Sequence, residues 1–239
     1  MARNWEPKHI FKSLVNNLLD AAGNWRICSA EPRGRFFFDD IKRFMAPEAT
    51  VFDVGANRGQ WCAEILAHVP TAEKVFCFEP MPAEFEHLLA NTRQDARISC
   101  YPYALSSTSC RTLLYQGVHP TTNSFSREWK GQPSFPVESI TLDDFCAMET
   151  IERINLLKID TEGHDLEVLK GAHELLRQRR VDFILAEVAF KASSRLALFD
   201  DIRAYLEDVG YQLFGVYDQQ PARDGTPALI YANACFIKP

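Results

Sequence analysis

The sequence has no surplus of basic residues that would suggest a nucleic-acid-binding protein. Its 26 Lys and Arg residues are outnumbered by 32 Asp and Glu residues, so the formal net charge is −6. Broad binding to nucleic acid depends on clustered positive charge that neutralises phosphates. We therefore expect no nucleic-acid partner, although these counts leave a local basic patch open.

The sequence also lacks long apolar runs, cysteine pairs and several common catalytic motifs. No stretch approaches the roughly 20 apolar residues of a membrane-spanning helix. The N-terminal segment MARNWEPKHIFKSLVNNLL has scattered charges, unlike a secretory signal. The seven cysteines show neither CxxC nor paired spacing, which favours reduced thiols over disulfides or a zinc site. GxSxG, P-loop and HExxH motifs are absent. We expect a cytoplasmic protein without a transmembrane segment.

What is present is the composition of an ordinary globular protein, with 46% hydrophobic and 24% charged residues. Residues 1–48 contain apolar side chains at near-helical spacing, and we expect an N-terminal helical segment with a second short helix over 36–44. Pro47 marks the boundary with the main domain, which we expect to cover residues 49–239.

In the main domain, short apolar runs alternate with helical patterns. The expected strands cover residues 50–55, 74–80, 96–105, 154–160, 181–188, 211–217 and 228–237, and the expected helices cover 58–68, 83–92, 165–178 and 196–209. This alternation predicts an α/β fold with a mostly parallel seven-stranded sheet. A hairpin loop over 218–227 would make an antiparallel strand at one edge.

One region breaks the alternation. Residues 111–116 and 136–140 read as short strands, and the irregular segment 117–135 lies between them. Long irregular segments in compact domains are often functional. This one carries Phe125, Trp129 and Phe135, which suggests a lid or wall over a substrate pocket. The alternative is a mobile surface loop.

The strongest local motif is VFDVGANRG at 51–59, an apolar strand that runs into a glycine turn and a helix. Gly55 lets a ligand approach the backbone closely. The acidic Asp53 suits a cationic ligand, such as the sulfonium and ammonium of S-adenosylmethionine (SAM), better than a pyrophosphate. The GxxxG spacing also lacks the third glycine of dinucleotide sites. The alternative is a turn that only packs.

Glu79 follows the second expected strand. An acid at this position of a doubly wound sheet accepts the ribose hydroxyls of a bound nucleoside. A carboxylate can accept two neighbouring hydroxyls at once. Alone, Glu79 could be a solvated strand end, but its separation from Asp53 and Gly55 favours the binding role.

The segment LLKIDTEGHD at 156–165 delivers a polar cluster to the edge where ligands bind in open α/β sheets. Asp160, Glu162 and His164 together have acid, base and metal-ligand capacity. Asp165 could instead favour the start of a helix through the helix dipole. Glu187, at the end of another strand, could face the same crevice or make a structural hydrogen bond.

These motifs together resemble the FkbM-type SAM-dependent methyltransferases, a branch of the class I Rossmann-like methyltransferases. The resemblance rests on VFDVGANRG, FEP at 78–80, Ala104-Leu105-Ser106, SITLDDF at 139–145 and LLKIDTEGHDLEVLKGA, in that order over residues 50–190. It implies methyl transfer from SAM to an oxygen, typically a hydroxyl of a sugar, glycolipid or natural product. Residues 1–48 and 110–135 lie outside it.

The resemblance also implies a role for each matching residue. The implied cofactor-binding residues are Asp53, Gly55, Ala56, Asn57, Gly59, Glu79, Pro80, Ala104, Leu105 and Asp160, and the implied catalytic residues are His164, Asp160 and Glu162. We expect His164 to be the base that takes the acceptor proton, because its ordinary pKa lies near neutrality. Asp160 could orient His164, act as the base itself or help to bind Mg²⁺, which the sequence permits but does not show.

Two other functions fit parts of the pattern. A Rossmann-type NAD(P)-dependent oxidoreductase would share the fold, but the missing third glycine and the absence of a Tyr-x-x-x-Lys pair count against it. A non-catalytic SAM-binding protein is disfavoured by the intact KIDTEGH cluster. The acceptor itself cannot be read from these motifs, because loops that vary build the acceptor side of such folds.

Overall fold

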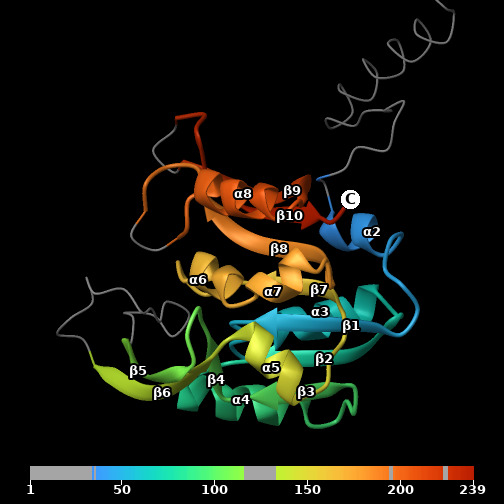
Figure 1. Ribbon diagram of the computed structural model, residues 1–239, viewed down its shortest axis with the longest axis vertical. Helices are drawn as coiled ribbons and strands as arrows, with labels where there is room; N and C mark the ends of the chain where they lie inside the picture. The colour runs from blue at the N-terminus through green and yellow to red at the C-terminus, as the bar shows by residue number, and fades with distance from the viewer. Residues whose placement is uncertain (1–33, 35, 116–132, 194–195, 223–225) are drawn as a thin grey trace, which may run out of the picture. The chain divides into compact units, whose positions relative to one another are not determined.

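The computed structural model describes residues 34, 36–115, 133–193, 196–222 and 226–239. Seven strands form one sheet in the order β3-β2-β1-β7-β8-β10-β9 (Figure 1). Their bounds are Ala49–Val54 (β1), Ala72–Phe78 (β2), Ile98–Tyr101 (β3), Ile154–Ile159 (β7), Val181–Ala189 (β8), Gln212–Pro221 (β9) and Leu229–Ile237 (β10). Strands β3, β2, β1, β7 and β8 pair in parallel, whereas β10 is antiparallel to both of its neighbours. The predicted sheet is confirmed, with the antiparallel pairing at one edge.

Helices cover both faces of this sheet. Those on one face are α5 (Leu142–Met148), α6 (Asp165–Lys170), α7 (His173–Arg177) and α8 (Phe199–Asp208), and those on the other are α2 (Phe37–Ile41), α3 (Gln60–His68) and α4 (Pro82–Thr92). Strands buried on two faces read as continuous apolar runs, which explains INLLKI in β7.

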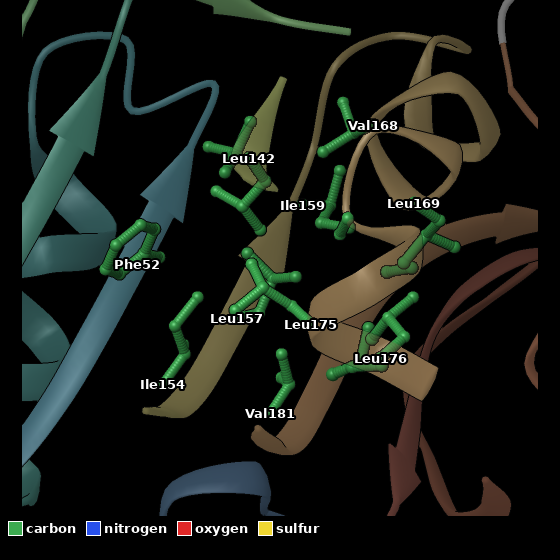
Figure 2. Packing of buried hydrophobic residues seen from close by; sticks show 14 of the residues in the cluster. Phe52, Leu142, Ile154, Leu157, Ile159, Val168, Leu169, Leu175, Leu176 and Val181 are labelled. Carbon is green, nitrogen blue, oxygen red and sulfur yellow. The ribbon is translucent and has the colours of Figure 1, made fainter. Parts of the chain in front are cut away.

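Side chains of β7 alternate between two separate hydrophobic cores. Leu157 and Ile159 belong to the core beneath α5 to α8, and Leu156 belongs to the core beneath α2 to α4. Figure 2 shows Leu157 close to Leu175, which comes from α7. Because both faces are packed, β7 has a fixed register, and its last residues emerge at a defined point of the sheet edge.

Two expected elements are divided in the structure. The strand expected over 96–105 is interrupted at Pro102, which has no backbone N–H to donate, and it continues as β4 (Tyr103–Leu105) in a second sheet. The helix expected over 165–178 is interrupted after α6. At this break, a Cβ on Gly171 would lie 2.0 Å from the carbonyl oxygen of Ser106, so this close approach requires glycine.

The second sheet has three strands in the order β4-β6-β5. Strands β5 (Cys110–Tyr115) and β6 (Ser134–Ile140) form an antiparallel pair, and β4 joins β6 in parallel. The two short strands expected beside the irregular segment are therefore confirmed. Most of that segment, including Phe125 and Trp129, lies outside the described residues. Its last aromatic residue, Phe135, packs against a small core that contains Met81 and Leu114.

The unit that contains the sheet begins at Phe36. This start lies before residue 49, because helix α2 packs on the sheet. The Tyr217 hydroxyl of β9 donates a hydrogen bond to Oδ2 of Asp40 at 3.0 Å, and the centres of the Phe37 and Tyr217 rings are 5.3 Å apart. The expected helical segment over the first 33 residues lies outside the described residues and stays a prediction.

The six cysteines in the described part of the chain are all free thiols. Within the same residues, no helix combines the length and apolar character that crossing a membrane requires.

Candidate functional site

A cavity of about 410 Å³ lies at the carboxyl ends of β1, β2 and β7, the edge where open α/β sheets bind ligands. Its walls come from the turns after these strands, the start of α3, and strands β4 and β5. The lining residues are Val54, Gly55, Ala56, Asn57, Gln60, Trp61, Phe78, Glu79, Pro80, Tyr103, Ala104, Leu105, Leu114, Lys158, Asp160, Thr161 and Glu162. We call this space the cofactor cavity.

Most of the site residues expected from the sequence meet there. Gly55, Ala56, Asn57, Glu79, Pro80, Ala104, Leu105, Asp160 and Glu162 all line the cofactor cavity. Three expected residues are not among its lining residues, namely Asp53, Gly59 and His164. The reasons differ for each of the three.

The turn after β1 needs glycine at two positions for different reasons. Gly55 has φ +74°, and a Cβ there would lie 1.9 Å from the carbonyl oxygen of Asp160. Gly59 has φ +85°, but a Cβ there would meet the side chains of Leu88 and Thr92 on α4, at 3.0 and 3.1 Å. Gly55 thus shapes the cofactor cavity, while Gly59 lets α3 pack closely against α4.

Glu79 is a buried carboxylate, 6% exposed, in the cavity wall. Its Oε2 accepts a hydrogen bond from the backbone N–H of Asn57, and its Oε1 accepts one from the backbone N–H of Met81, both at 2.9 Å. Burial raises the pKa of Glu79 to about 7, although these two N–H groups act in the opposite direction. Each oxygen keeps a second lone pair for a hydroxyl donor.

Asp53 lies beneath the cavity and is completely buried. Its Oδ1 is 3.0 Å from Nζ of Lys158, which is also 3.5 Å from Oδ2 of Asp160 and donates a hydrogen bond to the carbonyl of Gly55 at 3.2 Å. Burial alone would lower the pKa of Lys158, but Asp53 and Asp160 outweigh it and hold that pKa above its usual value. The ammonium therefore stays charged and ties the turn after β1 to the end of β7.

Asp160 is the carboxylate that this arrangement leaves accessible. Its side chain is 44% exposed and lines the cavity, whereas that of Asp53 is fully enclosed. The negative charge that a cationic ligand would meet is consequently on Asp160. From the sequence we expected Asp53 to present this charge. The pairing of Asp53 with Lys158 depends on the contact between two strands, and the sequence does not reveal that contact.

His164 and Asp165 lie just beyond the cavity wall, at the start of α6. Nε2 of His164 is 2.9 Å from the hydroxyl of Ser106, and burial lowers the pKa of His164. The carboxyl of Asp165 accepts a hydrogen bond from the hydroxyl of Thr161 at 2.9 Å, and burial raises its pKa to about 7. Both contacts fix the loop that presents Glu162.

The described residues contain no group of three or more His, Cys, Asp or Glu side chains that could hold a metal ion. Asp160 is also engaged with the Lys158 ammonium, which competes with a cation for the same oxygen. The geometry therefore does not support the magnesium site that the sequence permitted.

Residues 53–213 match the methyltransferase FkbM domain. The chain belongs to the FkbM methyltransferase family. Hexuronic acid methyltransferase AglP of Haloferax volcanii is 30% identical over 169 residues, which cover 69% of this chain and 65% of that protein. The 2-O-methyltransferase NoeI of Sinorhizobium fredii is 27% identical over 161 residues, covering 59% and 63% of the two chains. The chain thus spans less than two thirds of the length of either relative.

Among solved structures, the methyltransferase FkbM from Methylobacillus flagellatus KT matches with a TM-score of 0.57 at 18% identity. The match covers 84% of this chain and 46% of that one. This likeness confirms the Rossmann-like methyltransferase fold expected from the motifs.

Several lining residues of the FkbM domain were not singled out from the sequence. Lys158 carried a signal, since it is the one charged residue inside the apolar run INLLKI of β7. Trp61 and Tyr103 carried none, because only the fold brings the start of α3 and strand β4 to the same edge.

Proposed function

We propose that this protein is a SAM-dependent O-methyltransferase that acts on a hydroxyl of a sugar-like acceptor. The observation that carries the proposal is the buried carboxylate of Glu79 in a cavity that the Gly55 turn and Asp160 also line. Glu79 offers hydrogen-bond acceptors for ribose hydroxyls, and Gly55 has no side chain that could obstruct a ligand. Asp160 offers an accessible negative charge.

The residues of the cofactor cavity fit the parts of SAM. Glu79 has lone pairs left for two ribose hydroxyls, since each of its oxygens accepts one backbone N–H. The buried Ala104 and Leu105 supply an apolar wall for the adenine. The carboxylate of Asp160 supplies the charge that suits the positive end of the molecule.

When bound, SAM supplies a methyl group on a positively charged sulfur, which an oxygen can attack directly. The chain must then hold the acceptor oxygen in line, at roughly 3–3.5 Å, and exclude water. A carboxylate near that oxygen can take its proton as attack proceeds. Asp160 and Glu162 line the cavity, whereas His164 lies outside its lining and is engaged with Ser106. The base remains a prediction.

The relatives support the acceptor class. One is described as a hexuronic acid methyltransferase and the other as a 2-O-methyltransferase, so a sugar hydroxyl is the acceptor we expect here. The net charge of −6 supports a small molecule or glycan over nucleic acid.

Trp61 provides a direct test, since its ring lines the cofactor cavity 5.9 Å from the Lys158 ammonium. We expect S-adenosylhomocysteine to change the tryptophan fluorescence until the binding site is saturated. In calorimetry, NADH should give no heat of binding. The Trp61→Phe variant should still bind in calorimetry but lose most of the fluorescence change. Binding of NADH alone would instead favour the oxidoreductase alternative. S-adenosylhomocysteine binding without turnover on any acceptor would favour a non-catalytic protein.

A further inference from the structure

A second cavity, of about 750 Å³, adjoins the cofactor cavity. Glu162 lines both spaces and so marks the point where they meet. The rest of the second cavity's described lining comes from the end of β8, from Ser193, and from strands β9 and β10, through residues such as Glu187, Gln220 and Tyr231. We call this space the acceptor cavity.

Glu187 reaches this cavity because of the strand register. Ala186 of β8 pairs with Ile159 of β7, so Glu187 follows at the same level as Asp160 in the neighbouring strand. On its other side, Glu187 pairs with Asn233 of β10, whose amide donates to Asp218 at 2.9 Å. The register therefore places Glu187 at the same edge of the sheet as Asp160, which lines the cofactor cavity.

Charge around Glu187 is predominantly negative. Burial raises its pKa to about 8, and the carboxylates of Asp160, Glu162 and Asp165 add to this rise, while Lys158 opposes it. A carboxyl group with a pKa near the working pH is suited to take a proton from a hydroxyl. An anionic acceptor would be repelled by the neighbouring carboxylates of Asp160 and Glu162.

The other walls of the acceptor cavity suit an uncharged, hydroxylated molecule. Ser193, Gln220 and Tyr231 supply neutral hydrogen-bonding groups, and Leu196 and Ile230 supply apolar surface. The lining residues within the described part of the chain include no Lys or Arg. Sugars without a charge combine hydroxyls and apolar ring faces in the same way.

We infer that the acceptor cavity binds a neutral sugar or polyol and that Glu187 receives the proton of the reacting hydroxyl. This inference rests on the proposed methyltransferase function. In the step, the acceptor oxygen forms a bond to the methyl carbon, and the carbon–sulfur bond breaks with its electron pair remaining on sulfur. The hydroxyl proton passes to the Glu187 carboxylate, so the sulfur and the acceptor both leave the step uncharged.

Binding can be measured without turnover. Methyl β-D-glucopyranoside and methyl β-D-glucuronide differ only at C6, where a hydroxymethyl group is replaced by a carboxylate. Each is added to the complex with S-adenosylhomocysteine. Saturation-transfer difference NMR should show binding of the glucopyranoside, a weaker signal for the glucuronide, and loss of the glucopyranoside signal in Tyr231→Ala. A stronger glucuronide signal, no glucopyranoside signal, or an unchanged signal in Tyr231→Ala would each overturn the inference.

The proton role is tested with isotope-labelled SAM and a panel of neutral sugars and uronic acids. We expect methylation of a neutral sugar, and a loss of turnover on the order of 100-fold or more in Glu187→Gln. The matched control is Glu86→Gln, which changes an exposed carboxylate on α4 and should keep full turnover. Preference for uronic acids, methylation of none of the panel, or full turnover in Glu187→Gln would contradict the assignment.

Calorimetry with S-adenosylhomocysteine separates this inference from the proposed function. Glu187→Gln and Tyr231→Ala should bind S-adenosylhomocysteine as the unmodified protein does, because neither residue lines the cofactor cavity. Failure of the unmodified protein to bind S-adenosylhomocysteine would defeat the proposed function. Normal binding combined with any contrary sugar result would defeat only the acceptor inference.

Discussion

The ammonium of Lys158 lies 3.0 Å from the buried carboxylate of Asp53, directly beneath the cofactor cavity. Asp53 comes from β1 and Lys158 from the neighbouring strand β7, where the two residues are register partners. The pair has almost no access to water, with side chains 0% and 9% exposed. It therefore depends on mutual compensation, and the loss of one partner leaves an isolated buried charge.

Replacing Lys158 with Met should lower the free energy of unfolding by about 3–5 kcal/mol, the usual cost of leaving one member of a buried ion pair alone. Removing both charges, as in Asp53→Asn combined with Lys158→Met, should recover part of this loss, because no unpaired charge remains. Urea denaturation of the single and double variants measures both effects. A double variant less stable than Lys158→Met would argue against the pair as the cause.

Two glycine variants should behave differently. Gly55→Ala places a Cβ 1.9 Å from a backbone oxygen, so the turn must move and affinity for S-adenosylhomocysteine should fall at least tenfold. Gly59 also has a left-handed backbone, but a Cβ there would meet only side chains. For Gly59→Ala we therefore expect a loss of about 1–2 kcal/mol in the free energy of unfolding, with affinity for S-adenosylhomocysteine nearly unchanged. Calorimetry and thermal denaturation of both variants provide the comparison. Equal affinities in the two variants would exclude the Gly55 turn from the binding site.

Glu79→Gln tests the ribose contact while preserving shape. Loss of charge-assisted hydrogen bonds to the ribose should weaken binding of S-adenosylhomocysteine by roughly 10- to 100-fold, equivalent to about 1.5–3 kcal/mol. Glu79→Ala should weaken it at least as much. Thermal denaturation verifies that each variant is folded before titration. Unchanged affinity in a folded variant would show that Glu79 does not hold the ribose.

Stability should decrease as the pH rises. The pKa values of Glu79 and Asp165 are raised to about 7, and that of Glu187 to about 8, above ordinary values of about 4 in the unfolded chain. Between these limits the folded state binds more protons than the unfolded state, so the free energy of unfolding falls with increasing pH.

We expect the Tm of the ligand-free protein to drop between pH 6.5 and 8.5. His164, whose pKa is lowered, acts in the opposite direction only near pH 6.5, because above that value it is increasingly neutral in the unfolded chain as well. Glu187→Gln should show a shallower drop because one of the groups no longer titrates. A Tm that rises across this range would contradict the assigned directions.

The sequence by itself determined the secondary structure of the sheet and the chemistry of its edge. Apolar runs such as VFDV, VFCF and INLLKI are typical of strands covered on both faces, and Gly55 and Glu79 follow the first two of these at the spacing of a nucleoside site. These features are local, because period, turn chemistry and strand ends are written in adjacent residues. Family membership followed from the same motifs.

Only the tertiary structure decided which charged side chains a ligand can reach. Pairing of β1 with β7 buries Asp53 against Lys158 and leaves Asp160 as the accessible carboxylate. The packing of α3 on α4 explains Gly59 without a ligand. Register between β7 and β8 brings Glu187 beside Asp160 and forms the acceptor cavity. These outcomes depend on contacts between residues far apart in the chain, and no pattern of neighbouring residues encodes the distance between two strand ends.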